Sequence, residues 1–317
     1  MCGIAGAVSF IEDMREDMKV YENMQKSLLR RGPDQRGIIM TENSALIHTR
    51  LAVIDIDRGR QPMKFIAGEH SYTIVYNGEL YNTAEIRSEL ENDFDFETSS
   101  DTEVVLKAYV KWKAECVEKF NGIFAFAVWD EYDKKLFVAR DRIGVKPFFY
   151  FVNNRKFIFA SEIPALLEHP EIPHEIDEKS VAELLLMFPS RTAGYGVIRN
   201  INELKAGYFG FYSENGFETH QYWRMKAYEL NETFEETVEH TRELVADSIK
   251  RQLVSDVPVC TFLSGGLDSS IISSVANSEF KKSGKVLDTF SIDYRDNDKY
   301  FQKSHFQPNS DPEYIKC

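Results

Sequence analysis

Short runs of β-branched and aromatic residues dominate the first two-thirds of the chain. Such runs predict strands where turn residues separate them. The predicted strands cover residues 3–8, 72–76, 123–129, 136–139, 148–152 and 157–160. Apolar residues at helical spacing predict helices over residues 14–29 and 101–112. The first part of the chain is therefore predicted to be an α+β domain in which helices cover sheets.

The pattern changes between residues 213 and 233, where the chain is polar and rich in turn residues. An amphipathic helix is predicted after it, over residues 234–253. A strand (257–263), a glycine-rich turn, a helix (268–280) and a second strand (286–292) follow. A strand–helix–strand unit of this kind implies a parallel sheet. We predict one domain over residues 2–212, a linker over 213–233, and the start of an α/β domain over 234–317.

The second predicted domain holds few elements. One strand–helix–strand unit leaves sheet edges unpaired and buries little area. Residues 294–317 are polar and show no periodicity. We therefore expect this chain to end inside a domain.

Composition and charge exclude several classes of protein. The formal net charge of −13 disfavours binding to phosphate backbones, so no nucleic-acid partner is expected. The four cysteines show neither metal-ligand spacing nor a dense disulfide pattern. The chain has no apolar run of about 18 residues and no signal-peptide pattern, so we expect no membrane partner and a cytoplasmic location. Cys116 and Cys260 are expected to be buried packing residues.

Cys2 is the first candidate for chemistry. If Met1 is removed, Cys2 carries both a thiol and a free α-amine. That amine has an ordinary pKa of about 7.7–8.0, so it can accept the thiol proton near neutral pH. One residue then supplies both nucleophile and base, and its thiolate can attack a glutamine side-chain amide. If Met1 is retained, the Cys2 nitrogen is an amide and cannot act as the base.

The order of motifs resembles the class II glutamine amidotransferases. The motifs are residues 1–6 (MCGIAG), 31–34 (RGPD), 48–55 (HTRLAVID), 61–63 (QPM), 76–82 (YNGELYN) and 100–103 (SDTE). Residues 120–126 (FNGIFAF) and 140–147 (RDRIGVKP) are similar to the asparagine synthetase branch of that family. The resemblance implies an αββα sandwich of antiparallel sheets, followed by the start of a parallel-sheet ATP-pyrophosphatase domain.

The resemblance also implies roles for residues around Cys2. Arg50 is expected to bind the glutamine α-carboxylate, because a planar guanidinium matches a carboxylate in bidentate fashion. Asp101 is expected to bind the α-ammonium and also stands where a helix cap would be. Asn77 and Gly78 resemble an oxyanion hole, in which each donates one N–H group. The remaining glutamine-pocket residues implied by the resemblance are Leu51, Ala52, Val53, Ile54 and Glu79.

Asn77-Gly78 is also the strongest short signal for a hairpin turn. We therefore expect a turn at this point, and we expect the turn itself to present the oxyanion donors.

A second motif, FLSGGLDSS over residues 262–270, follows a predicted strand and opens a predicted helix. Small residues at a helix N-terminus expose backbone N–H groups that can hold a phosphate. The motif lacks Gly-Lys-Ser/Thr, so it is not a Walker A loop. It resembles the pyrophosphate loop of the ATP pyrophosphatases, which implies ATP as cofactor and Asp268 as a Mg²⁺ ligand. The implied ATP-site residues are Leu263, Ser264, Gly265, Gly266, Asp268, Ser269 and Ile292.

The resemblance implies glutamine hydrolysis at Cys2 and use of the released ammonia to amidate aspartate through β-aspartyl-AMP. The later phosphate motif and aspartate pocket of the family are not found here, so the glutaminase half is the activity we expect of this chain. The expected partners are glutamine, aspartate as acceptor, and a second copy in a homodimer. Two alternatives stay open at this stage: another carboxylate acceptor, or a catalytically silent subunit.

Overall fold

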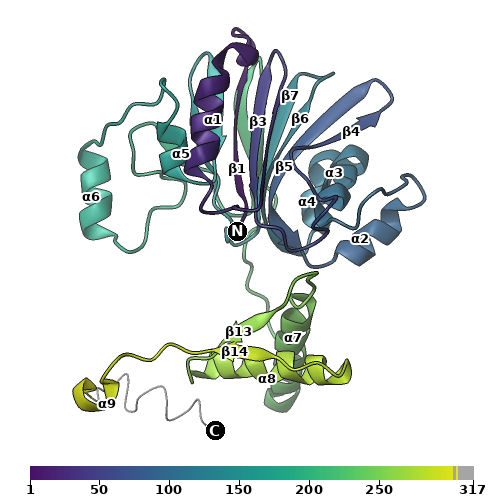
Figure 1. Ribbon diagram of the computed structural model, residues 1–317, viewed down its shortest axis with the longest axis vertical. Coiled ribbons are helices and arrows are strands. Elements are labelled where there is room, and N and C mark those ends of the chain that lie inside the picture. Colours follow the sequence, from purple (N-terminus) through teal and green to yellow (C-terminus); the bar gives the residue numbers. More distant parts are fainter. Residues whose placement is uncertain (303–304, 306–317) are drawn as a thin grey trace. The chain divides into compact units, whose positions relative to one another are not determined.

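Two six-stranded antiparallel sheets face each other in the computed structural model, which describes residues 1–302 and residue 305 (Figure 1). The first sheet has the order β10-β8-β9-β1-β3-β2. Its strands are β10 (Ile201–Glu203), β8 (Phe149–Val152), β9 (Lys156–Ala160), β1 (Gly3–Ser9), β3 (Ser44–Arg50) and β2 (Gln35–Met40). The second sheet has the order β12-β11-β7-β6-β5-β4. Its strands are β12 (Gly216–Gln221), β11 (Tyr208–Ser213), β7 (Lys135–Arg140), β6 (Gly122–Asp130), β5 (His70–Leu80) and β4 (Met63–Ala67).

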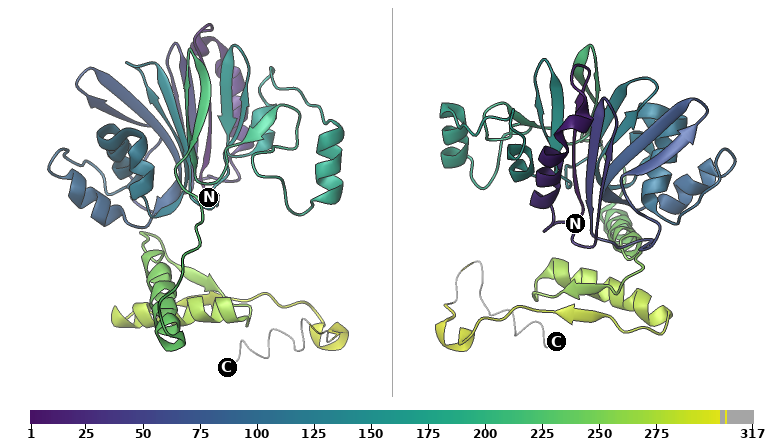
Figure 2. Two further views of the ribbon diagram at one scale, coloured as in Figure 1. Left: turned by 180° about the vertical axis from the view of Figure 1, so that it is seen from behind. Right: turned by 45° about the horizontal axis from the view of Figure 1, so that its top comes forward.

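Helices cover the outer face of each sheet (Figures 1 and 2). The first sheet is covered by α1 (Met18–Ser27) and α5 (Ile163–Leu167), and the second by α2 (Thr83–Leu90), α3 (Asp101–Trp112) and α4 (Cys116–Lys119). The short 3-10 helices η1 (Met14–Asp17) and η2 (Lys113–Glu115) precede α1 and α4, and α6 (Glu178–Leu186) follows α5. The predicted αββα sandwich of antiparallel sheets is confirmed.

Alternation along each strand explains why these strands lie between two apolar layers. In β1, Ile4 and Val8 pack between the sheets, whereas Ala5 and Ala7 face the helices. In β6, Trp129 packs between the sheets. Successive side chains of a strand point to opposite faces, so a strand buried on both sides needs apolar residues at nearly every position. This is why the strands appear in the sequence as continuous apolar runs.

The structure corrects two predicted segments. Asn77 and Gly78 lie inside β5, where they pair with Ala125 and Phe124 of β6, so the predicted hairpin turn is wrong. The pairing between β5 and β6 runs on to Leu80, which leaves no room for a turn at Asn77. The predicted linker over 213–233 begins too early, because residues 216–221 form β12 and pair with β11.

The chain divides into two compact units, Met1–Lys226 and Ala227–Cys317. The second unit begins with α7 (Phe234–Arg251), where a capping box joins Thr233 and Glu236. It continues with β13 (Cys260–Phe262), α8 (Leu267–Lys282), β14 (Asp288–Phe290) and α9 (Asn297–Tyr300). The last part of the predicted polar tail, residues 303–304 and 306–317, lies outside the described residues.

Strands β13 and β14 are parallel, as the strand–helix–strand pattern predicts. Each has three residues, fewer than predicted, and Phe262 and Phe290 are exposed. Cys260 is exposed as well, which corrects its expected burial, whereas Cys116 is buried as expected. One helix covers only one face of a two-stranded sheet, so side chains on the other face stay exposed.

Candidate functional site: a cavity beside Cys2

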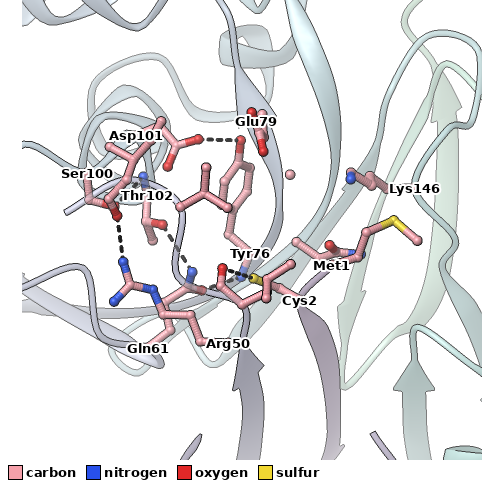
Figure 3. Close-up of a pocket in the computed structure, with 15 residues that line it drawn as sticks. Met1, Cys2, Arg50, Gln61, Tyr76, Glu79, Ser100, Asp101, Thr102 and Lys146 are labelled. Carbon is pink, nitrogen blue, oxygen red and sulfur yellow. Dashed lines mark hydrogen bonds between the residues drawn. The ribbon is translucent and has the colours of Figure 1, made fainter. Parts of the chain in front are cut away.

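A cavity of about 110 Å³ lies where β1 begins and β3 ends (Figure 3). Strands β1 and β3 are antiparallel, and Gly3 pairs with Thr49, so Cys2 and Arg50 meet at one end of the sheet. The structure thus brings together nearly all residues predicted to bind glutamine. Those that line the cavity are Cys2, Arg50, Leu51, Val53, Ile54, Asn77, Gly78, Glu79 and Asp101.

Ala52 is the predicted residue that does not line this cavity. Its backbone N–H donates to Asp34 Oδ2 at 2.8 Å, so it holds the loop instead. The prediction also missed residues that line the cavity, namely Met1, Gln61, Tyr76, Ser100, Thr102 and Lys146. All of these belong to the motifs quoted above, but a motif does not state which of its side chains face inward.

The backbone on both sides of Cys2 is fixed by Arg31. The N-terminal amine of Met1 donates to the Arg31 carbonyl at 3.0 Å, and Arg31 Nε donates to the Cys2 carbonyl at 2.9 Å. A 2.8 Å ion pair with Glu162 orients the Arg31 guanidinium. Next to it, a Cβ on Gly32 would approach the Thr49 carbonyl carbon to 2.2 Å, so this position requires glycine.

The Cys2 thiol faces the cavity and donates to the Leu51 carbonyl at 3.6 Å. Burial raises the pKa of this thiol, whereas its hydrogen bond to Leu51, the N-terminal amine and Arg50 act in the opposite direction. A partly buried thiol whose pKa is raised needs a base or a nearby positive charge before it can become a nucleophile.

Asn77 supplies an unpaired donor at this cavity. Its Nδ2 is buried and has no hydrogen-bond partner among the residues that the structure describes. A buried amide without a partner costs about 1–3 kcal/mol, so such a group calls for an explanation. Gly78 is adjacent, and a Cβ there would come within 2.6 Å of the Ile123 carbonyl. The strand therefore brings backbone and side-chain donors close to the cavity without a turn.

Arg50 and Asp101 lie in the cavity wall, and both already have partners. Arg50 Nη2 donates to the carbonyls of Ile54 and Asp55, at 2.6 and 2.8 Å, and so fixes the loop that lines the cavity. Asp101 Oδ2 accepts from the Tyr76 hydroxyl at 3.1 Å. Burial raises the pKa of Asp101. The N-cap of α3 is Ser100, whose hydroxyl accepts from Thr102 N, so Asp101 is not the cap.

His48 lies behind the cavity wall and is fully buried. Its Nε2 lies 3.1 Å from the Tyr76 carbonyl, which can only accept, so Nε2 carries the proton. Burial lowers the pKa of His48 from 6.5 to about 3. The native protein therefore holds a neutral imidazole, whereas the unfolded chain binds a proton below its ordinary pKa.

This difference predicts acid sensitivity. The contribution of His48 to the free energy of unfolding has its full value above the unfolded-state pKa of 6.5 and is lost as the pH falls toward about 3. Between about pH 7 and about pH 5, His48 alone should lower the free energy of unfolding by about 2 kcal/mol. Urea unfolding of the native chain and of His48→Gln at both pH values measures this. The variant should lose about 2 kcal/mol less, and an equal loss in both proteins would contradict the prediction.

The second predicted site is an open cavity of about 520 Å³ at the N-terminus of α8. Of the predicted ATP-site residues, Ser264, Gly266, Asp268 and Ser269 line it. Leu263, Gly265 and Ile292 do not. Leu263 instead donates its N–H to the Phe290 carbonyl at 2.8 Å and so joins the two strands.

The loop before α8 fits an anion. Gly266 is the N-cap of α8. It has no side chain that could accept a hydrogen bond from the first backbone N–H groups of the helix. Gly265 has a φ of 79°, which glycine adopts readily. Asp268 is exposed beside the loop and offers one carboxylate, which suits Mg²⁺ because this ion takes one or two carboxylates together with phosphates.

No helix in the described part of the chain is long and apolar enough to cross a membrane. Residues 1–223 match the family of glutamine amidotransferase domains, and residues 240–309 match the asparagine synthase family.

The chain is 47% identical to asparagine synthetase [glutamine-hydrolyzing] 3 of Bacillus subtilis, over 100% of this chain and 52% of that protein. It is 30% identical to asparagine synthetase B [glutamine-hydrolyzing] of Escherichia coli, over 87% of this chain and 44% of that protein. This chain thus spans about half the length of these relatives.

The fold is also similar to that of glutamine phosphoribosylpyrophosphate amidotransferase from B. subtilis. That similarity has a TM-score of 0.52 and 18% identity, and it covers 96% of this chain and 69% of the other. The family matches and the relatives agree with the sequence motifs around the cavity. The chain therefore belongs to the glutamine amidotransferase family, and its second unit carries a match to the asparagine synthase family.

Proposed function

We propose that this chain hydrolyses glutamine at Cys2 and releases glutamate and ammonia. The observation that carries the proposal is the meeting of the Cys2 thiol, an unpaired Asn77 amide and opposite charges around one small cavity. The relatives, which are named as glutamine-hydrolysing, support the same reaction.

In the proposed reaction the Cys2 thiolate adds to the side-chain carbonyl carbon of glutamine. The carbonyl oxygen becomes an oxyanion, which the Asn77 amide and the Gly78 backbone N–H stabilise. The C–N bond then breaks, the nitrogen gains a proton and leaves as ammonia, and a thioester remains. Water hydrolyses the thioester, releasing glutamate and restoring the thiol. After removal of Met1, the α-amine of Cys2 is the proposed base.

Charges around the cavity suit the two charged ends of glutamine. We assign the α-carboxylate to Arg50, whose guanidinium would exchange a backbone carbonyl for the carboxylate, which is the stronger acceptor. We assign the α-ammonium to Asp101 and Glu79. Burial and the Asp101 carboxylate raise the pKa of Glu79, and a bound ammonium would offset both effects.

For the whole protein we propose that ammonia from this site amidates aspartate after ATP has activated it. The relatives named as asparagine synthetases support this acceptor, and the loop at α8 supports a phosphate ligand. Ser264, Gly266 and Ser269 would hold the phosphates of ATP, and Asp268 would hold Mg²⁺. Leu263, Gly265 and Ile292 stay predictions of the sequence, as does a homodimer.

The decisive experiment measures glutamate and ammonia released from glutamine by the purified chain. Intact mass must first show whether Met1 has been removed. We expect equal amounts of both products, formed continuously and without ATP. Absence of both products from protein that lacks Met1 would contradict the proposed function.

A further inference from the structure

Lys146 is a second cation at the glutaminase cavity, and the proposed reaction assigns it no role. It lies in the loop between β7 and β8 and is 7% exposed. It lines the same cavity as Cys2 and Glu79, on the side opposite Arg50 and Gln61 (Figure 3).

The Lys146 ammonium has no partner of its own. Within the described residues it makes neither a hydrogen bond nor an ion pair, and Glu79 makes no ion pair with it. The backbone around it is fixed, because Lys146 N donates to Asp141 Oδ2 and Lys146 O accepts from Arg140 Nε. A mostly buried charge without a partner is costly, and burial lowers the pKa of Lys146. A fold that keeps such a charge beside a cavity points to a use in that cavity.

We propose, on the basis of the proposed glutaminase function, that Lys146 is a positioning residue whose positive charge keeps Cys2 ready to react. One positive charge has two useful effects here. It favours the anionic thiolate over the thiol, and it favours the neutral α-amine over the ammonium. The amine must be neutral before it can accept the thiol proton, and the thiolate is the form of Cys2 that then attacks.

Other charges face the same groups. Cys2 is also influenced by the N-terminal amine, Arg50 and Asp101. Lys146 is faced by Glu79, Arg31 and Asp141, and the N-terminal amine by Arg31 and Asp34. Arg31 pairs with Glu162, and Arg50 donates to the carbonyls of Ile54 and Asp55. Lys146 differs from both because its ammonium makes neither a hydrogen bond nor an ion pair among the described residues.

The test measures alkylation of Cys2 by iodoacetamide as a function of pH, without glutamine. Peptide mass spectrometry follows Cys2, and the exposed Cys260 of the same molecules serves as the internal reference. In Lys146→Met, the apparent pKa of the Cys2 reaction should rise and its rate near pH 7.5 should fall between about threefold and tenfold. Cys260 should react as before, and Lys146→Arg should keep the native profile.

Lys26→Met is the matched control, because it removes a charge from an exposed lysine on α1. It should leave the Cys2 profile unchanged. Loss of an unpaired buried cation should also leave the melting temperature of Lys146→Met unchanged or raise it. An unshifted Cys2 profile, or a Lys146→Met chain that unfolds, would overturn the inference in favour of a structural role. Because alkylation requires no turnover, it gives this answer even if the glutaminase assay fails.

Discussion

Replacement of Cys2 by alanine is expected to reduce glutamate release by at least about a thousandfold. The thiol is the group that forms the covalent bond in the proposed reaction. Cys2 is the only cysteine among the residues that line the described cavity. The variant can still bind glutamine and keeps the oxyanion donors, but these donors stabilise attack by water only weakly. Initial rates of glutamate and ammonia formation measure the loss.

Cys260→Ala is the matched control, because this cysteine is exposed and belongs to the second unit. It should retain the native rate of glutamine hydrolysis. If Cys2→Ala keeps more than about a tenth of the native rate while remaining folded, another group is the nucleophile and the proposed mechanism is wrong.

The sequence could predict much of the fold because its strands are buried on two faces. Trp129, Phe126 and Ile4 belong to runs in which nearly every position is apolar, and such runs remain recognisable without knowledge of the partner strand. Segment ends were harder to predict. Residues 216–221 form an exposed edge strand, so they carry polar residues and resembled a linker.

In the candidate site, as in the fold, some features could be predicted from the sequence and others could not. Cys2, Arg50 and Asp101 were predicted through motifs, and the pairing of β1 with β3 explains why Cys2 and Arg50 meet. Asn77-Gly78 was predicted to form a turn because local propensity favours one, but pairing along the whole of β5 outweighs that preference. Lys146 was not predicted as a site residue, because burial and the direction of a side chain depend on packing between distant segments.

Replacement of Asn77 by alanine is expected to lower kcat for glutamine hydrolysis by about a hundredfold to a thousandfold. The Asn77 amide has no partner in the described part of the chain, so its donor is free for a ligand atom. If that atom is the oxyanion, the amide acts mainly in the transition state, and KM should change by less than about threefold. Steady-state kinetics over a range of glutamine concentrations separates the two constants.

The unpaired Asn77 amide also leads to an expectation about stability, which distinguishes an oxyanion donor from a structural residue. Removing a buried donor that has no partner leaves no acceptor unsatisfied, so Asn77→Ala should lower the melting temperature little. Asn202→Ala is the control, since that amide donates to the Asn200 carbonyl at 3.4 Å, and its kcat should stay native. A large loss of stability in Asn77→Ala, or a rise in KM with kcat unchanged, would show that Asn77 supports the fold or binds the ground state. Either result would remove the oxyanion role, because a group that stabilises the transition state must act on kcat.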